Sequence, residues 1–537
     1  MNDHPSASFR PAPSRRRVLA LSAAAALAAV ALFASLAADK APPPAAATAT
    51  TSWNGVPTVQ PILPSDVKVP VSQFNFNNLA WQQFITLNWA ADPALPGQPD
   101  PSVSPSAFGA PGDTTPVVWE TYKESSEVFL PGGAAPAPWN AARSLPAAFA
   151  RIEGFAGLRA TLRPGVKGLI ARSKFDGGPT VDLTDLGDVV EAGTGGAWLT
   201  AQPKMNNYLT LFEKRLNQDE FNYIVQNQLY NATNQTPFAQ TQGLNLPDGS
   251  KAFATYGTAG AIEIKAAWIQ LDDPSVWPLF KTSRAYVSYP TSGGGQTPPA
   301  LVTVGLVGLH IIRKTPNAQQ FVWSTFEHVN NDPSTTDLQN QTLKAWYTYY
   351  NLNCNKETDY YGCTPNRRPV PGTDPYNAPV QVVRTTPLST STVNNIVALN
   401  QSVWATIAAA NPNSVFLNYQ LVNTLWPNAN TSIPPGATTP LTKGNSQPPE
   451  TQQPVASTIL ETYHQNIDCL TCHASAPVAT TTAAKTQVVV LSAATLAKRQ
   501  VGGKAATDQK TLAANYSFLL SEAQAAPAAP PAAKKPE

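Results

Sequence analysis

The stretch LVTVGLVGLHIIRK, residues 301–314, and the stretch QFVWSTFEHV, residues 320–329, decide the predicted fold. The first is an almost continuous apolar run, which is typical of a strand buried on both faces. The second alternates along its length and is rich in Val, Trp and Phe, as strands are. Further segments of the same kind, bounded by Pro, Gly, Asp or Asn, are residues 116–130, 261–271 and 284–290. We therefore predict an α+β fold in which an antiparallel β-sheet or sandwich core carries peripheral helices.

Helices are expected at three places around this core. NLAWQQFITLNW, residues 78–89, places its large apolar side chains at helical spacing, with Asn77 and Asn78 as caps. Residues 399–427 are helical or mixed in pattern. Residues 506–524 predict a last amphipathic helix, whose apolar face holds Leu512, Tyr516, Leu519 and Leu520.

The overall composition argues against nucleic-acid binding. Of the 537 residues only 13% are charged, and the formal net charge is +2, so the chain has no basic field to attract phosphates. Its 52 prolines are about double the usual share of roughly 5%, which indicates long surface connections rather than a helical bundle.

The N-terminus predicts export. Arg15, Arg16 and Arg17 precede an apolar run over residues 18–38, the layout of a signal peptide. The run is also about long enough to stay uncut as an inner-membrane anchor, so both forms are kept open. We expect a periplasmic protein, soluble or tethered, with residues 39–72 as a flexible Pro/Ala/Thr linker and residues 526–537 as a disordered tail of the same composition.

The four cysteines fall into two pairs. Because an exported chain meets an oxidising compartment, Cys354 and Cys363, which flank a polar loop, predict a disulfide. Cys469, Cys472 and His473 form the pattern C-x-x-C-H, the attachment signature of c-type haem. A redox disulfide would not need the histidine, whereas haem attachment requires it. At i, i+3 and i+4 of a helix the three side chains share one face, so we predict one covalent haem c with His473 as the proximal iron ligand.

If the iron has a second protein ligand, we expect it upstream, because no methionine or histidine follows His473. His328, at a strand end, is the preferred distal ligand, and His310, within a strand, is the second choice. Met205 is more simply a core side chain, and His464 precedes the motif too closely to reach the opposite face of a haem. Residues 456–525 are thus the expected helical haem segment, and residues 73–455 form a large β-rich domain.

Candidates for acid and base chemistry are few. Glu120, Glu263, Lys265 and Glu327 lie in expected strands, where a buried charge needs a partner. Solvated or ion-paired strand residues explain them more simply. The chain has no Walker loop, zinc-protease motif or nucleophile elbow.

With these segments in place, the chain resembles exported bacterial cytochrome c family proteins. In these, EIKAAW-, VGLHIIRKT- and WSTFEHVNN-like segments precede a single ETYxQxxxCLxCH and a terminal YSFLLSEAQ-like stretch, so the resemblance covers most of residues 73–525. It implies covalent haem binding and electron transfer, and offers no substrate.

The predicted function is that of an exported monohaem c-type cytochrome that passes electrons to a periplasmic partner protein. The alternative is a peroxidase- or oxygenase-like haem enzyme with an open iron position and a substrate pocket in the large domain. A third hypothesis gives the haem a structural or sensory role while the large domain binds a partner.

Overall fold

The computed structural model describes residues 53–143, 152, 166–170, 208–289, 296–358, 362–367, 381–427, 431–442, 455–463, 465–466, 469–479 and 511–526. The predicted signal segment, Met205, His464 and the tail beyond residue 526 lie outside these ranges. Residues 53–72, in the predicted linker, form no helix or strand, but Val59 and Val67 are buried.

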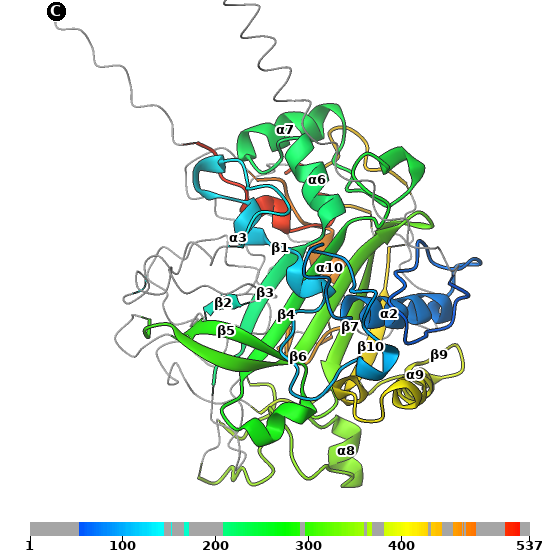
Figure 1. The fold of residues 1–537 in the computed structure, drawn as a ribbon, viewed down its shortest axis with the longest axis vertical. Helices are drawn as coiled ribbons and strands as arrows, with labels where there is room; N and C mark the ends of the chain where they lie inside the picture. The colour runs from blue at the N-terminus through cyan, green and yellow to red at the C-terminus, as the bar shows by residue number, and fades with distance from the viewer. Residues whose placement is uncertain are drawn as a thin grey trace, which may run out of the picture. The chain divides into compact units, whose positions relative to one another are not determined.

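One eight-stranded sheet organises the molecule (Figure 1). Its strands are β1 (Lys123–Glu124), β2 (Lys167–Ile170), β3 (Leu211–Leu216), β4 (Ile262–Gln270), β5 (Thr282–Ser288), β6 (Ala300–Thr315), β7 (Ala318–His328) and β10 (Tyr419–Leu425). A separate two-stranded sheet joins β8 (Thr390–Ser391) to β9 (Asn394–Asn395).

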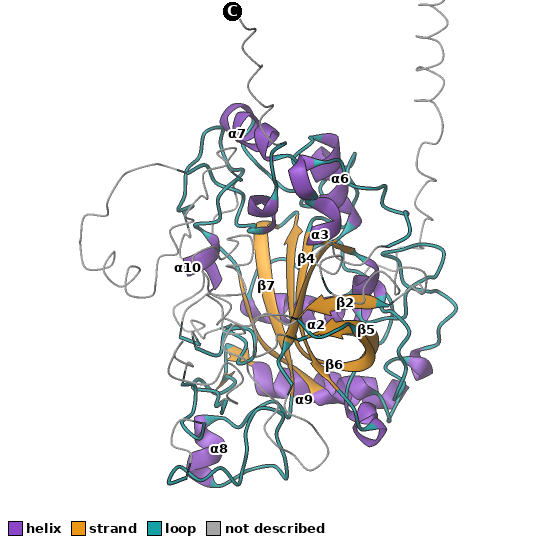
Figure 2. Cartoon of the chain, turned by 90° about the vertical axis from the view of Figure 1, so that its left-hand side faces the viewer, coloured by secondary structure: helices purple, strands orange, loops and turns teal. Residues whose placement is uncertain are grey.

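The long strand β6 divides the sheet into two branches. Strand β4 pairs with one edge of β6, while the other edge is shared between β5, which pairs with residues 300–305, and β7, which pairs with residues 308–315. All pairings are antiparallel except that of β2 with β5, so the sheet is mixed. Figure 2 shows β2 and β5 running across the direction of the other strands. Gly305 lies at the branch point, where a Cβ atom would come within 2.7 Å of the Leu271 side chain.

The helices are short and peripheral. They are α2 (Gln73–Leu87), α3 (Ser125–Val128), α6 (Gln218–Gln226), α7 (Ala232–Thr241), α8 (Thr335–Asn340), α9 (Ile396–Ala410) and α10 (Cys469–His473). Short 3₁₀ segments cover Pro105–Ala107, Val118–Thr121, Pro131–Gly133, Lys251–Phe253, Pro274–Leu279, Val415–Asn418 and Leu519–Glu522.

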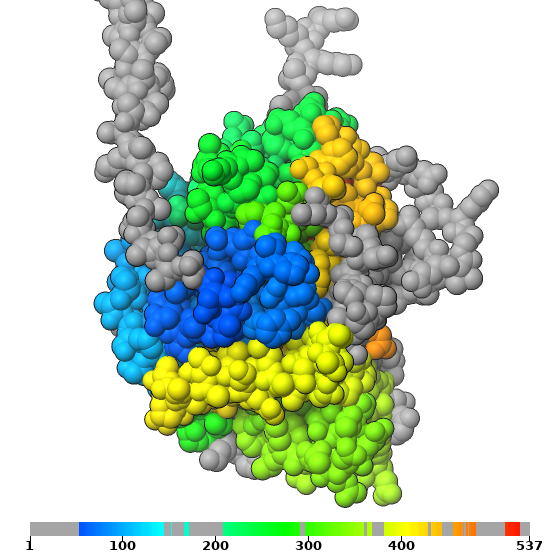
Figure 3. Space-filling model, turned by 90° about the vertical axis from the view of Figure 1, so that its right-hand side faces the viewer, coloured from blue at the N-terminus to red at the C-terminus, as the bar shows by residue number. Residues whose placement is uncertain are grey.

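We call the side of the sheet covered by α2 and α9 the helix face. Phe84 of α2 stacks on Phe326 of β7 with ring centroids 4.4 Å apart, and Trp81 meets the same ring edge-on. The Trp81 indole donates to Asn400 of α9 at 2.9 Å, which ties the two helices together. Figure 3 shows the α2 segment in blue beside the α9 segment in yellow.

We call the opposite side the C-terminal face, because residues 455–463, α10 and residues 511–526 cover it. Its residues include Glu263 and Lys265 on β4, His310 on β6, and Trp323 and Thr325 on β7, which alternate with residues of the helix face. Ile459 and Leu460 pack there against Ala267, Ile269 and Val307. The C-terminal segment is therefore part of the core of the body, and Figure 2 shows α10 beside β7.

The α+β prediction is confirmed, and the core is a sheet rather than a sandwich. The segments 261–271, 284–290, 301–314 and 320–329 are strands β4, β5, β6 and β7, and residues 399–427 are mixed, with α9 followed by β10.

The strand prediction for residues 116–130 is wrong. The segment folds into a 3₁₀ turn, the two-residue strand β1 and the short helix α3. Glu120 and Glu127 explain the difference, because their carboxylates accept the backbone N–H groups of Val117 and Glu124, both at 2.9 Å. Such side-chain bonds offer the backbone an alternative to a strand ladder.

Two helix predictions also need correction. Helix α2 starts earlier than expected: Ser72 caps it by accepting the N–H of Asn75, and Asn77 and Asn78 lie inside the helix. Residues 511–524 do not form the predicted amphipathic helix and are helical only in the 3₁₀ turn Leu519–Glu522. Asn515 and Tyr516 have φ angles of 54° and 66°, which a right-handed helix does not allow.

Candidate functional site

Helix α10 carries the predicted haem signature. Its five residues place Cys469, Cys472 and His473 at i, i+3 and i+4, on one side of the turn. Leu470 and Ala474 are fully buried in the main core and anchor the other side. Cys469 and Cys472 are partly exposed thiols. The motif therefore forms a helical turn, held by its buried residues, that places two thiols and an imidazole on the same side.

The imidazole of His473 is held in one orientation. Its Nδ1 lies 2.8 Å from the carbonyl oxygen of Tyr516, and because a carbonyl only accepts, Nδ1 carries the proton. The ring meets Trp323 edge-on at 5.4 Å and Phe518 at 5.1 Å. Burial lowers the pKa of His473 to about 4, so the ring is neutral at pH 7 and its Nε2 carries a lone pair. This is the tautomer that a histidine needs to bind a metal through Nε2.

Beneath α10, a polar row crosses the sheet on the C-terminal face. Lys265, His310 and Thr325 are cross-strand neighbours on β4, β6 and β7. His310 lies 2.9 Å from Thr325 Oγ1 through Nδ1 and 2.9 Å from Glu461 Oε1 through Nε2. Lys265, His310 and Glu461 all interact electrostatically with His473, so the row belongs to its surroundings.

The carboxyl group of Glu461 joins the C-terminal segment to this row. Burial raises its pKa, but His310, Lys265 and the backbone N–H of Ser457 together outweigh burial and hold the pKa below its ordinary value. Glu461 is therefore ionised and accepts the Nε2–H of His310. Its Nδ1 lies against the Thr325 hydroxyl, so both ring nitrogens of His310 are engaged.

His328, the preferred distal ligand in the sequence prediction, lies elsewhere. It is five residues from Trp323 on the same strand, so its side chain points to the helix face while Trp323 points to the C-terminal face. Its Nε2 bonds the carbonyl of Leu279 at 2.9 Å, its Nδ1 accepts the N–H of Asn330, and its ring stacks on Phe280. Burial lowers its pKa to about 3. These contacts argue against the predicted distal role for His328.

The second choice, His310, is on the correct face and close enough to affect His473. It therefore replaces His328 as the histidine that faces the motif. Its bonds to Thr325 and Glu461 would have to rearrange before it could bind iron.

A hydrogen-bond donor without a described partner, the Trp323 indole N–H, belongs to a ring that contacts His473. Trp323 is 1% exposed, and its indole N–H has no hydrogen-bond partner in the described part of the chain. A buried donor without a partner is costly, and a carboxylate of a bound group would satisfy it. A haem carries two such carboxylates. The paired thiols, the neutral His473 and this orphaned N–H together fit a covalently bound haem.

A cluster of three or more histidine, cysteine or carboxylate ligands for a bare metal ion is absent from the described residues. Haem iron does not require one, because the porphyrin itself supplies four of the ligands. His473 then needs to contribute only one protein nitrogen.

The acid and base candidates are mostly paired. Glu120 binds Lys167 at 2.6 Å and Lys281 at 3.1 Å, and Glu327 binds Arg384 and the hydroxyl of Thr458. These groups are ion-paired strand and loop residues, as the simpler interpretation expected.

Glu263 differs from these candidates because it lies beside another carboxyl group. Burial, followed by repulsion from Glu263, raises the pKa of Glu220 well above its ordinary value. Burial raises the pKa of Glu263 to about 7. Such a pair shares a proton at neutral pH. The hydroxyl of Ser517, next to Tyr516, also bonds Glu263.

Sequence reasoning did not single out Glu461 or Asn515 as site residues. Glu461 lies 151 residues from His310 in the chain, and Asn515 lies far beyond the motif. An asparagine inside an expected amphipathic helix is the one local signal, since asparagine tolerates the left-handed conformation better than most residues.

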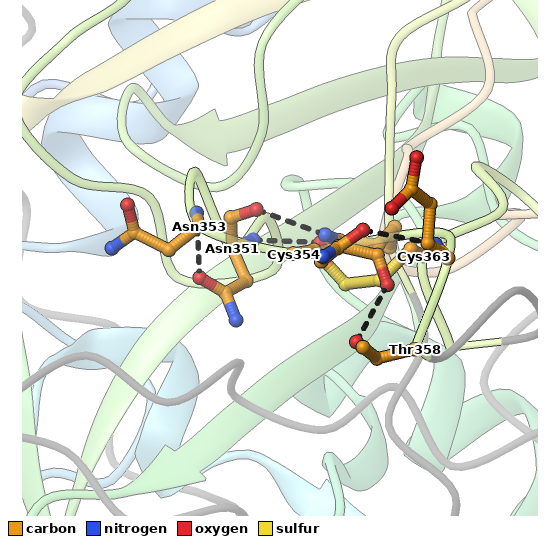
Figure 4. Close-up of a disulfide and its surroundings, with 8 residues drawn as sticks. Asn351, Asn353, Cys354, Thr358 and Cys363 are labelled. Carbon is orange, nitrogen blue, oxygen red and sulfur yellow. Dashed lines mark hydrogen bonds between the residues drawn. A yellow bond between two sulfur atoms is a disulfide. The ribbon is translucent and has the colours of Figure 1, made fainter.

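The predicted disulfide between Cys354 and Cys363 is present and closes a loop between residues nine apart (Figure 4). Within this loop region the N–H of Cys354 bonds the carbonyl of Asn351, whose side chain in turn accepts the N–H of Asn353. Gln381 accepts the N–H of Asn351 from a neighbouring segment. Cys354 and Cys363 thus form a disulfide, whereas Cys469 and Cys472 are thiols on helix α10.

Comparison with protein-family models, with curated proteins and with solved structures gives no match for this chain. Among the described residues, no helix combines the length and apolar character needed to cross a membrane. The predicted N-terminal anchor lies outside those residues.

Proposed function

We propose that this protein is an exported monohaem c-type cytochrome that carries single electrons between periplasmic partners. The observation that carries the proposal is the arrangement at α10: two thiols and a neutral imidazole on one side of a turn, with the imidazole proton fixed on Nδ1. The disulfide between Cys354 and Cys363 supports export, because such bonds persist in oxidising compartments.

Each residue of the site has a defined task. Cys469 and Cys472 would tether the porphyrin through thioether bonds, and His473 Nε2 would bind the iron. The carbonyl of Tyr516 accepts the Nδ1 proton and so makes the ring a stronger ligand. The bound haem supplies one-electron chemistry.

The remaining neighbours fix the ring and set its electrostatic surroundings. Trp323 and Phe518 pack edge-on against the imidazole and limit its rotation. Lys265, His310 and Glu461 place charge and polar groups near His473, which tunes the iron potential.

The test is production in a bacterium that has a working haem-ligation system. Purified protein should be coloured and heavier than its polypeptide by one haem that stays attached after denaturation. The double variant Cys469→Ser/Cys472→Ser should lose the attached haem. The matched double variant Cys354→Ser/Cys363→Ser removes the same number of cysteines, here those of the disulfide, and should keep the haem. A colourless wild-type protein of polypeptide mass would end the proposal.

A second candidate is a haem enzyme with an open iron position. It is favoured by the hydrogen bonds of the two histidines considered as distal ligands, since His310 and His328 both have their ring nitrogens engaged. In this case the linked pair of His310 and Glu461 is an acid–base group beside the haem.

The two candidates differ in the spin state and the gas binding of the iron. An iron with two protein ligands is low-spin and does not bind carbon monoxide. This result would support electron transfer. A high-spin iron that binds carbon monoxide supports the enzyme.

A further inference from the structure

The loop that orients His473 has an unusual backbone. Asn515 and Tyr516 are consecutive residues with φ angles of 54° and 66°, both in the left-handed region. Asparagine is tolerated there, whereas a bulky tyrosine is an outlier whose strained backbone persists only when its surroundings enforce it. Both residues are almost fully buried, at 0% and 2% exposure. Something in the core therefore holds this turn in place.

The side chain of Asn515 supplies that constraint. Its Oδ1 accepts from the backbone N–H of Leu246 at 2.8 Å and from Lys314 Nζ at 2.7 Å. Its Nδ2 donates to Gln320 Oε1 at 2.7 Å. The three partners come from the loop before β4, from β6 and from β7, so one amide ties the turn to three parts of the body.

A second contact holds the next residue. The hydroxyl of Tyr516 donates to the carbonyl of Thr442 at 2.8 Å. The N–H of Ser517 bonds the carbonyl of Ala514 and closes the turn. Tyr516 is thus fixed at its side chain, while its backbone carbonyl is left to point outward from the turn.

This backbone conformation changes the hydrogen bond that the Tyr516 carbonyl accepts. In a continuous helix the carbonyl of Tyr516 would accept the N–H four residues later. The left-handed turn breaks that pattern, and the carbonyl accepts Nδ1–H of His473 instead. The strained backbone therefore has one identifiable product, a fixed acceptor for the imidazole proton.

We propose that Asn515 is a positioning residue that holds the turn at residues 514–517 so that the Tyr516 carbonyl fixes the orientation and proton of His473. The inference rests on the proposed haem function. A firm Nδ1–H bond makes the imidazole more electron-rich, which favours ferric iron and lowers the reduction potential. Asn515 would thus act on the haem potential through the Tyr516 carbonyl and His473.

The deciding variant is Asn515→Gly. Glycine adopts a positive φ freely, so the turn can still form, but the three side-chain bonds are lost. We expect the haem to stay covalently attached and its midpoint potential to rise above that of the wild type, because the carbonyl is no longer pinned. Gln341→Gly is the matched control: Gln341 also has a positive φ, of 57°, but it is exposed at the end of α8. The midpoint potential of the Gln341→Gly variant should equal that of the wild type.

If Asn515→Gly does not fold, Gln320→Met removes the acceptor of Asn515 Nδ2 and leaves the turn residues intact, and a smaller rise is expected. An unchanged potential in a folded variant that carries haem would overturn the inference, whatever its stability. That result is distinct from failure of the proposed function, in which the wild-type protein itself would carry no covalent haem.

Discussion

Two buried side chains on opposite faces of the central sheet, Lys167 and Trp323, differ in how their polar groups are paired. On the helix face, Lys167 contacts Glu120 and Glu213 at 2.6 and 2.9 Å and lies over the Trp268 ring. On the C-terminal face, the Trp323 indole N–H is left without a partner and the turn at Asn515 is strained. Paired charges are typical of stability, whereas orphaned donors and strained backbone collect at functional sites. These two features support the candidate site on the C-terminal face.

The largest expected effect is on the helix face. Lys167→Met leaves Glu120 and Glu213 buried without their shared cation, although Lys281 and Arg215 still partner them. Removing one member of a buried ion pair costs about 3–5 kcal/mol, and we expect about 3 kcal/mol because of those remaining partners. Urea unfolding of the purified protein measures it.

Lys251→Met is the control for Lys167→Met, because Lys251 is exposed. Its unfolding free energy should change by less than about 0.5 kcal/mol. Haem content should be the same in both variants. A loss of haem from folded Lys167→Met would mean that the helix face also serves the site.

Two tryptophans on opposite faces offer a matched second comparison. The Trp268 indole donates to Glu213 at 2.7 Å, whereas the Trp323 indole has no described acceptor. Trp268→Phe therefore removes a bond to a buried carboxylate and should cost about 1–3 kcal/mol. In a haem-free Cys469→Ser/Cys472→Ser background, Trp323→Phe should cost much less, because no hydrogen bond is lost.

In the haem-bearing protein we expect Trp323→Phe to lower the unfolding free energy more than it does in the haem-free background. The difference would measure an acceptor that the haem provides to the indole. If Trp323→Phe lowers the unfolding free energy equally in the two backgrounds, the haem does not accept a hydrogen bond from the indole N–H. Urea unfolding of all four proteins gives the comparison.

The sequence could predict the central strands and the motif, but not the residues that contact the motif. Strands β4, β6 and β7 were foreseeable, because strands buried on both faces give long apolar runs rich in Val, Ile and Trp. The spacing of Cys469, Cys472 and His473 was equally foreseeable, since it is a local requirement of haem attachment.

The partners of the motif were not foreseeable. The apolar spacing of Leu512, Tyr516 and Leu519 matches a helix, yet the bonds of Asn515 to distant residues override it. Nor does periodicity say which histidine faces the motif. Whether His310 or His328 lies on the same side as His473 depends on strand register and on the path of the C-terminal segment.

The histidines on the two faces provide a spectral comparison. Because His310 lies beside His473 and His328 on the helix face, His310→Phe should alter the haem absorption spectrum or its pH dependence, while His328→Phe should leave both unchanged. Spectra of the ferric and ferrous proteins measure this. A change on replacing His328 with none on replacing His310 would support His328 as the distal ligand.

The last comparison concerns pH and the helix face alone. Burial lowers the pKa of His328 from 6.5 to about 3, so the unfolded chain binds a proton that the folded protein does not bind in this interval. Stability from this group is fully present above pH 6.5 and is lost as the pH falls towards 3, because the slope of stability with pH follows the extra proton of the unfolded state.

His328→Phe should flatten this part of the stability profile, since phenylalanine stacks on Phe280 without titrating. Urea unfolding between pH 4 and pH 7 compares the two slopes, with the haem spectrum recorded in the same samples. A flatter profile with an unchanged spectrum assigns His328 to stability and leaves the iron to the C-terminal face. An unchanged slope would mean that His328 does not stay neutral in the folded protein, and its hydrogen bonds to Leu279 and Asn330 would then no longer argue against an iron ligand at this position.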